Sequence, residues 1–199
     1  MRGMPTGVAM RDAREQLFEA AERILLRAGP QALTSRSVTA EAGCAKGVLH
    51  RHFADFDAFL AELVIDRAAR IQSQSAALLA AAGTGTVAGT LTGVLMDLFQ
   101  SVAVAIVGLI TFRDDLRARL RQAWPTGVPV LAEATAMIRT YLAAERDLGR
   151  IAPGADIAML APMLIGTGHL LFADREGPTP DREAVAKVVT AAIAGVVCL

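Results

Sequence analysis

The hydrophobic positions along this chain recur at helical spacing, and no stretch alternates apolar and polar residues as a half-buried strand would. Leu17, Ala21 and Leu25, for example, form one face of a first helix, which Gly29-Pro30 ends. The pattern predicts about nine helices separated by short breaks that contain glycine or proline. Their expected ranges are 11–28, 35–42, 45–52, 55–81, 87–112, 113–123, 128–147, 156–173 and 181–197. We therefore expect an all-α fold.

The helix predicted over residues 87–112 is apolar on nearly all sides, and residues 98–112 carry no charge. This uncharged run is shorter than the roughly 20 residues that a membrane span needs. We interpret it as a buried helix in the middle of a domain, where it either fills a solid core or lines a cavity.

The composition favours a folded chain, because 53% of the residues are hydrophobic and 20% are charged. The net charge is zero, so a nucleic-acid site has to be a local basic patch and not a basic domain. Residues 34–53 contain such a patch. Arg36, Lys46 and Arg51 stand there against Glu41 alone, together with two of the three histidines.

The short helices at 35–42 and 45–52, joined by a turn at Gly43, describe a helix-turn-helix. Val38 and Ala42 are four residues apart and can face inward, and Leu49 and Phe53 continue the same core in the second helix. The outer face of the second helix is then free to enter a DNA major groove.

At these residues the sequence resembles the TetR family of bacterial repressors, and Val38 is a conservative match. Eight positions agree with the family's pattern outright: Thr34, Arg36, Ala42, Gly43, Gly47, Leu49, His52 and Phe53. Elsewhere the resemblance is limited to the number, length and order of the helices. It implies an N-terminal three-helix DNA-binding domain over residues 1–54 and a helical effector-binding and dimerisation domain over residues 55–199.

The resemblance also implies which residues contact DNA. The positions that contact phosphates and fix the protein on the duplex are expected to be Thr34, Ser35, Lys46, His50 and His52. The positions that read bases are expected to be Arg36, Ala45, Gly47 and Arg51.

Some positions depart from the family's pattern in ways that remove phosphate contacts. His50 stands in place of a tyrosine, Ala45 of a serine, Val48 of a threonine and Phe56 of a lysine. A shallower salt dependence of DNA binding is the expected consequence. The arginines near the N-terminus can compensate by reaching a minor groove, and the candidates are Arg2, Arg11 and Arg14.

In the family the second domain holds the effector. Methionines, sparse aromatic residues and a few polar groups are the candidates to line the pocket: Met96, Phe99, Gln100, Phe112, Trp124, Met137, Tyr141, Met163 and His169. Because residues 98–112 carry no charge, we expect an apolar or weakly polar effector. A place in an ordinary core is the alternative for each residue, and a single histidine among leucines is typical of such a core.

The last two predicted helices each carry an apolar stripe, which we interpret as the dimer surface of a four-helix bundle across a two-fold axis. The stripes consist of Ile157, Leu160, Ala161, Leu164, Gly168, Leu171, Val185, Val188, Val189, Ala192 and Val196. A core within one chain is the alternative interpretation.

Together these features predict a sequence-specific DNA-binding transcriptional regulator, a homodimeric repressor that an apolar small-molecule effector releases from double-stranded operator DNA. The alternatives are an activator or a ligand-independent regulator on the same fold, or a helical carrier or enzyme with a vestigial helix-turn-helix. No nucleophile–base set or metal-binding spacing stands out, so we expect no enzyme, no cofactor and no metal.

The two cysteines form no disulfide framework, and the N-terminus has no apolar run typical of a signal peptide. A cytoplasmic protein with no membrane segment is the simplest interpretation. Cys44, next to the basic patch, is either a redox switch or a small apolar residue.

Overall fold

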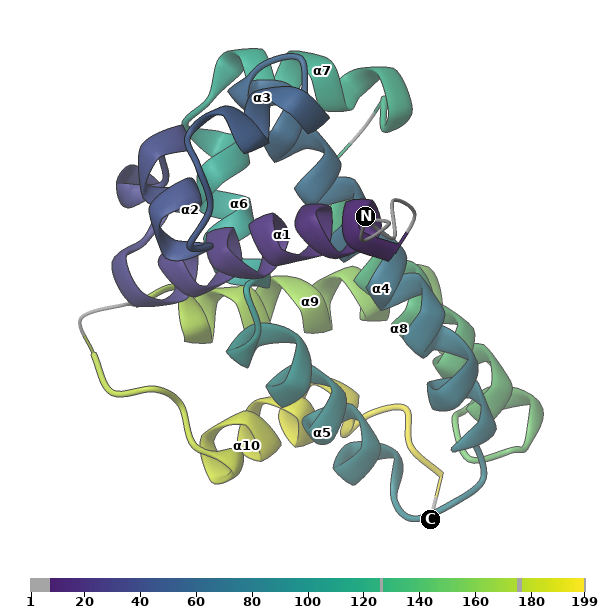
Figure 1. The fold of residues 1–199 in the computed structure, drawn as a ribbon. Helices are drawn as coiled ribbons and strands as arrows, with labels where there is room; N and C mark the ends of the chain where they lie inside the picture. The colour runs from purple at the N-terminus through teal and green to yellow at the C-terminus, as the bar shows by residue number, and fades with distance from the viewer. Residues whose placement is uncertain (1–7, 126, 175–176, 199) are drawn as a thin grey trace. The chain divides into compact units, whose positions relative to one another are not determined.

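The computed structural model describes residues 8–125, 127–174 and 177–198, with side chains from residue 13 onward (Figure 1). Arg2 and the side chain of Arg11 lie outside this description. The described residues form ten α-helices and one short 3₁₀ turn, and their β-pairing is limited to a single bridge between Ile151 and Val197. The prediction of an all-α fold is confirmed.

The chain divides into two compact units, residues 1–65 with 105–126 and residues 66–104 with 127–199. The helices of the first unit are α1 (Val8–Ala28), α2 (Ser35–Glu41), α3 (Gly47–His52), the beginning of α4 (Phe56–Ala80), most of α6 (Ala103–Thr111) and α7 (Asp114–Ala123), and η1 is the 3₁₀ turn Pro30–Ala32. The second unit contains the remainder of α4 together with α5 (Val87–Gln100), α8 (Pro129–Asp147), α9 (Ile157–Ala173) and α10 (Arg182–Ile193).

The single helix predicted over residues 87–112 is wrong, because the structure has two helices there, α5 and α6, bent by 53° at the break between them. The Ser101 hydroxyl donates to the Leu98 carbonyl at the end of α5 and accepts from the Ala103 N–H, 3.3 Å away, at the start of α6. A hydroxyl that serves both backbone ends lets one helix stop and another begin.

No single helix among the described residues is long and apolar enough to cross a membrane. Only α5 and α6 taken together reach that length and hydropathy, and the bend separates them.

The core of the first unit forms around α1, against which α2 packs (Figure 1). Leu17, Ala21 and Leu25 are buried as their spacing predicts. Aromatic rings join α1 to the following helices, since the centroids of Phe18 and Phe53 lie 5.8 Å apart and those of Phe53 and Phe59 lie 5.0 Å apart. The residue after α3 is thereby anchored in the core that holds α1.

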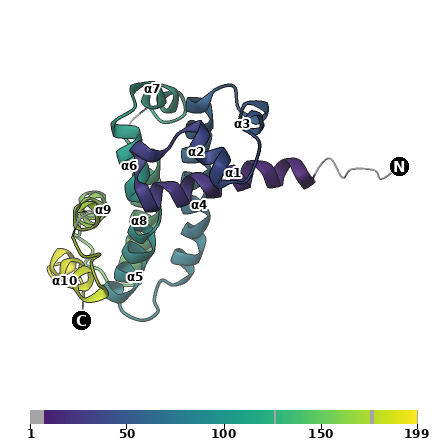
Figure 2. The same cartoon turned by 60° about the vertical axis from the view of Figure 1, so that its left-hand side comes forward.

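In the second unit, α9 packs on α8 and α10 packs on α5, and α9 and α10 lie next to one another (Figure 2). Gly168 lets α9 approach α5 closely, because a Cβ at this position would lie 2.4 Å from the Phe99 ring of α5. The Phe99 ring in turn stacks on Phe172 at a centroid distance of 5.8 Å.

Candidate nucleic-acid interface and effector region

The first helix of the helix-turn-helix, α2, begins with a reciprocal cap. The Thr34 hydroxyl accepts from the Ser37 N–H at 3.0 Å, and the Ser37 hydroxyl accepts from the Thr34 N–H at 2.9 Å. This capping box satisfies two of the N–H groups that a helix start leaves unpaired. It fixes the N-terminus of α2, an end at which free N–H groups and the helix dipole favour phosphate.

The turn between α2 and α3 depends on Gly43, whose φ of 65° lies in the left-handed region that favours glycine. The Gly43 N–H donates to the Ala40 carbonyl at 3.1 Å, and the Cys44 N–H donates to the Thr39 carbonyl at 3.0 Å. These bonds close the end of α2 and direct the chain into α3 at a sharp angle.

The second helix, α3, is held by its inner face. Leu49 is fully buried, and Phe53, directly after the helix, is 3% exposed. Gly47, His50 and Arg51 lie on the opposite face and are exposed. Nothing lies within 4 Å of where a Cβ of Gly47 would be, so the backbone itself is open to a close approach at this point.

The cations of this surface have no acidic partner. Arg36, Lys46 and Arg51 are exposed, and none forms an ion pair with another residue that the structure describes. Glu41, the acidic residue of this segment, is paired with arginines of α1. It accepts from Arg27 at 2.8 Å and from Arg23 at 3.0 Å, and these two hydrogen bonds lower the pKa of its carboxyl. The helix-turn-helix therefore presents uncompensated positive charge.

The nine residues proposed to contact DNA all lie on the helix-turn-helix segment. Seven are exposed, and Ser35 and His52 are half-buried. The Ser35 hydroxyl is buried and has no partner among the described residues, so only the N–H of Ser35 remains to serve a phosphate. Arg14, proposed for a minor groove, instead bonds Glu62 and lies 4.6 Å from the centroid of the Phe53 ring.

A second set of contacts, which no local sequence pattern indicates, joins α7 to the beginning of α4. Arg113 pairs with Asp57 at 2.7 Å and Arg119 with Asp55 at 2.6 Å, and the Arg113 guanidinium lies 5.6 Å from the centroid of the Phe56 ring. Asp55 also caps α4 by accepting from the Ala58 N–H at 2.7 Å, as its position predicts. The Ala58 N–H first, and then Arg119, lower the pKa of Asp55.

Part of the proposed effector pocket is brought together in the second unit. His169 lies 6.2 Å from Phe99 between ring centroids, and its Nδ1 is buried with no partner among the described residues. Met137 and Tyr141, one turn apart on α8, are both buried. Burial raises the pKa of Tyr141 to about 12, and the nearby Glu145 carboxyl adds to this effect.

The other proposed effector residues are more open. Met96 and Trp124 are half-buried and Gln100 is exposed, while Phe112 is 85% exposed and Met163 is 52% exposed. Phe112 and Trp124 also belong to the first unit and not to the unit that holds the rest.

Glu145, which sequence reasoning missed, is fully buried in the second unit. It accepts from the Gly83 N–H at 3.3 Å and lies 3.4 Å from Arg150, whose guanidinium donates to the Gly85 carbonyl at 2.7 Å. Glu145 and Arg150 thus tie the turn between α4 and α5 to the end of α8. The signal in the sequence was its helical register, because Glu145 follows the buried Tyr141 by one turn.

Most residues of the two stripes proposed as a dimer surface are buried within this chain. Seven of the eleven residues are buried, and Leu171, Val188, Ala192 and Val196 are half-buried. Of the two helices that carry them, α9 packs against α5 and α8, α10 packs against α5, and the two contact one another within the second unit. The exposed side of α9 is nevertheless apolar too, since Met159 is 58%, Met163 52% and Leu170 74% exposed.

The family model described as "Bacterial regulatory proteins, tetR family" matches residues 17–63, which include the whole helix-turn-helix. Among curated proteins none is similar enough to count as a relative.

Several solved structures share the fold over nearly the whole chain. A putative TetR-family transcriptional regulator from Mesorhizobium loti is 16% identical, with a TM-score of 0.71, and the match covers 95% of this chain and 98% of that one. FadR from Bacillus subtilis, solved with stearoyl-CoA, is 15% identical with a TM-score of 0.65, covering 91% and 98%. SmeT, the repressor of the Stenotrophomonas maltophilia multidrug efflux pump SmeDEF, is 18% identical with a TM-score of 0.62, covering 93% and 90%.

These likenesses agree with the geometry of α2 and α3 and with the matched segment of the sequence. Residues 17–63 are similar to the N-terminal domain of the tetR family of bacterial regulatory proteins, and the chain as a whole shares its fold with solved TetR-family regulators.

Proposed function

We propose that this protein is a sequence-specific DNA-binding repressor that leaves its operator when a small apolar effector binds. The observation that carries the proposal is the outer face of the helix-turn-helix, where Arg36, Lys46 and Arg51 are exposed and unpaired. Lysine and arginine on such a face neutralise phosphates, and arginine also pairs bidentately with guanine in the major groove.

The second unit supports the effector part of the proposal. Buried polar atoms without a partner cost free energy unless a ligand or water satisfies them. The His169 Nδ1, beside the Phe99 ring, and the Tyr141 hydroxyl, near the Glu145 carboxyl, are two such atoms. Two structural neighbours were solved with compounds that have a large apolar part, FadR with stearoyl-CoA and SmeT with triclosan. An apolar compound with a polar group for His169 or Tyr141 is the effector that these residues would accept.

We place the dimer contact on the exposed side of α9 and not on the buried stripes. Met159, Met163 and Leu170 are large apolar residues in the open, and α9 has no charged residue anywhere along its length. An apolar helix face of this kind marks a surface that another molecule covers. In a dimer, the two recognition helices have to lie about 34–36 Å apart to enter successive major grooves.

The effector acts by preferring a state that cannot bind DNA. Linkage requires that operator DNA weaken effector binding by the same factor, and a coupling of roughly 1–3 kcal/mol is usual. The turn between α4 and α5, held by Glu145 and Arg150, lies within the same unit as His169 and Tyr141. We expect a bound effector to act on α4 through these contacts.

A gel shift with the DNA upstream of the protein's own gene tests DNA binding. We expect a specific complex that Lys46→Ala and Arg36→Ala weaken, while Arg182→Ala on α10 leaves it unchanged. A screen of apolar compounds by the fluorescence of Trp124, the single tryptophan, then finds ligands to test for operator release. An upstream fragment bound no better than a scrambled duplex would overturn the proposal.

A further inference from the structure

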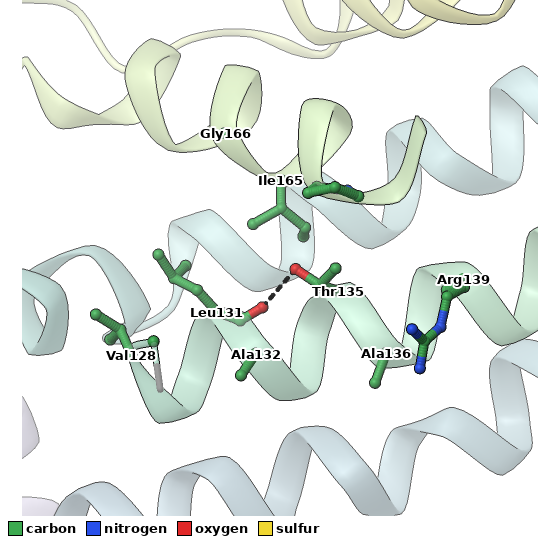
Figure 3. A pocket seen from close by; sticks show the side chains of 10 residues that line it. Val128, Leu131, Ala132, Thr135, Ala136, Arg139, Ile165 and Gly166 are labelled. Carbon is green, nitrogen blue, oxygen red and sulfur yellow. Dashed lines mark hydrogen bonds between the residues drawn. The ribbon is translucent and has the colours of Figure 1, made fainter. Parts of the chain in front are cut away.

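A groove runs between α8 and α9 in the second unit, and none of the residues proposed for the effector or the DNA lines it. One part of it, with a volume of about 440 Å³, is bordered by Val128, directly before α8, by Leu131 and Thr135 of α8, and by Pro162, Ile165 and Gly166 of α9 (Figure 3). This volume falls within the range of roughly 300–1,000 Å³ that is typical of small-molecule sites. We call this feature the α8–α9 groove.

The chemistry of the groove differs from one end to the other. Along the part just described, Thr135 and Arg139 are the polar side chains, and the Thr135 hydroxyl already donates to the Leu131 carbonyl at 2.7 Å (Figure 3). A second pocket shares Arg139 with the first and is lined further along α8 by Ala143 and Arg146, so we treat the two as parts of one groove. The walls are therefore apolar toward Val128 and cationic toward Arg146.

The two arginines have no counter-charge. Neither Arg139 nor Arg146 forms an ion pair with a residue in the described part of the chain, and no acidic residue lines either part of the groove. They are seven residues apart on α8 and so project from the same side of the helix two turns apart. A guanidinium pair of this kind is suited to a carboxylate, sulfate or phosphate group.

We propose that the α8–α9 groove binds an amphipathic organic anion, with its acidic group at Arg139 and Arg146 and its apolar chain along Leu131, Pro162 and Ile165. From Val128 to Arg139 the groove follows α8 for about 16 Å, at 1.5 Å per residue, which suits an extended alkyl chain. The site stands without the proposed function, and only the role of the anion as effector rests on it. Its ligand differs from the uncharged effector expected from the sequence.

The groove adjoins the exposed apolar surface of α9 that we propose for the dimer contact. Met159, Met163 and Leu170, which we propose for the dimer contact, do not line the groove. Ala158, Pro162 and Ile165 line it from the flank of α9 that faces α8. Gly166 lines the groove as well and lies between Met163 and Leu170 on the exposed side of α9, so the oligomeric state has to be measured for each groove variant.

Isothermal titration with decanoate, kept below the concentration at which it aggregates, tests the site. We expect decanoate and decyl phosphate to bind, decyltrimethylammonium to bind at least tenfold more weakly, and the methyl resonances of Leu131 and Ile165 to shift. Arg139→Gln and Arg146→Gln should each weaken decanoate about tenfold, as loss of a charge-assisted contact does. Arg182→Gln, on α10 and outside the groove, is the matched control and should leave binding unchanged.

Gly166→Leu provides a second variant that does not depend on charge. No atom lies within 4 Å of where its Cβ would be, so a side chain can start there without a clash, and we expect the leucine to extend into the groove. The protein should stay folded by circular dichroism and lose decanoate binding.

Three results would each overturn the site. The first is that decyltrimethylammonium binds as tightly as decanoate, and the second is that decanoate still binds to Gly166→Leu and to both arginine variants. The third is that the protein binds only to phosphatidylglycerol vesicles. A change of oligomeric state in the groove variants, with decanoate binding intact, would show that a second copy occupies the groove and would also overturn it. Decanoate binding by a protein that binds no DNA would leave the site standing and reject the proposed function instead.

Discussion

At the scale of single residues, DNA binding depends on which charges the fold leaves unpaired. Glu41 could have neutralised a cation of the helix-turn-helix, but Arg23 and Arg27 of α1 occupy it. Arg36, Lys46 and Arg51 stay free as a result. A small local patch thus accounts for DNA binding in a chain whose net charge is zero.

Replacing Lys46 and replacing Arg36 should affect DNA binding in different ways. Lys46→Ala removes a phosphate contact, so it should weaken all DNA sequences alike and lower the slope of log Kd against log salt by about 0.9. Arg36→Ala should cost roughly 1–3 kcal/mol on the operator and much less on unrelated DNA, because it removes a base contact. Fluorescence anisotropy at several salt concentrations separates the two. Equal losses on specific and unrelated DNA for both variants would contradict the assigned roles.

The pairing of Glu41 also predicts how the stability of the fold depends on pH. Hydrogen bonds from Arg27 and then Arg23 lower the pKa of its carboxyl in the folded state. A lowered carboxyl pKa stabilises the fold above the pKa of the unfolded chain, and this stabilisation is lost as the pH falls through the folded pKa. Glu41→Gln should therefore be less stable than the native protein at neutral pH and equally stable in strong acid.

Urea unfolding at several pH values measures this difference. The loss should be small, because the arginines are half or more exposed and exposed ion pairs contribute little. Glu19→Gln, an exposed position elsewhere on α1, is the control. A deficit that is the same at every pH would show that the charge of Glu41 is not its cause.

At the scale of helices, the packing of α9 against α5 depends on a glycine. A Cβ at Gly168 would lie 2.4 Å from a Phe99 ring that is itself only 3% exposed and stacked on Phe172. Gly168→Ala should therefore destabilise the fold by about 1–3 kcal/mol, as overpacking does. Gly166→Ala, half a turn away with no atom within 4 Å, should instead gain up to about 1 kcal/mol from helix propensity. Thermal unfolding that moves both variants in the same direction would contradict this packing.

The sequence predicted helices well where periodicity and caps agree, and less well where a helix is apolar on all sides. The helix-turn-helix and the cap at Asp55 follow from local chemistry and were predicted. The break at Ser101 was missed, because a serine inside an apolar run carries no helix-stop signal. In α9 the apolar residues leave no polar face, so their pattern does not indicate which side meets the core. The pairs of Arg113 and Arg119 with α4 depend on contacts that no local pattern reveals.

At the scale of the whole molecule, the account requires a dimer formed through the exposed side of α9. Met163→Glu should weaken the dimer strongly, because an unpaired charge buried at an interface costs several kcal/mol. The single chain should tolerate it, since Met163 is 52% exposed. Gln122→Glu, at an exposed position of α7, introduces the same charge and should leave the dimer intact. Sedimentation velocity reports both, and a dimer unaffected by Met163→Glu would place the contact elsewhere.

The central claim is that α2 and α3 recognise a DNA sequence. It is tested most directly by the ratio of two dissociation constants, for the upstream operator and for a scrambled duplex of the same length and at the same salt. For the native protein the account predicts a ratio of at least about a thousand in favour of the operator. Arg36→Ala combined with Arg51→Ala should reduce that ratio sharply while the protein remains a folded dimer. A native protein that binds both duplexes equally, or a double variant that keeps the full ratio, would contradict it.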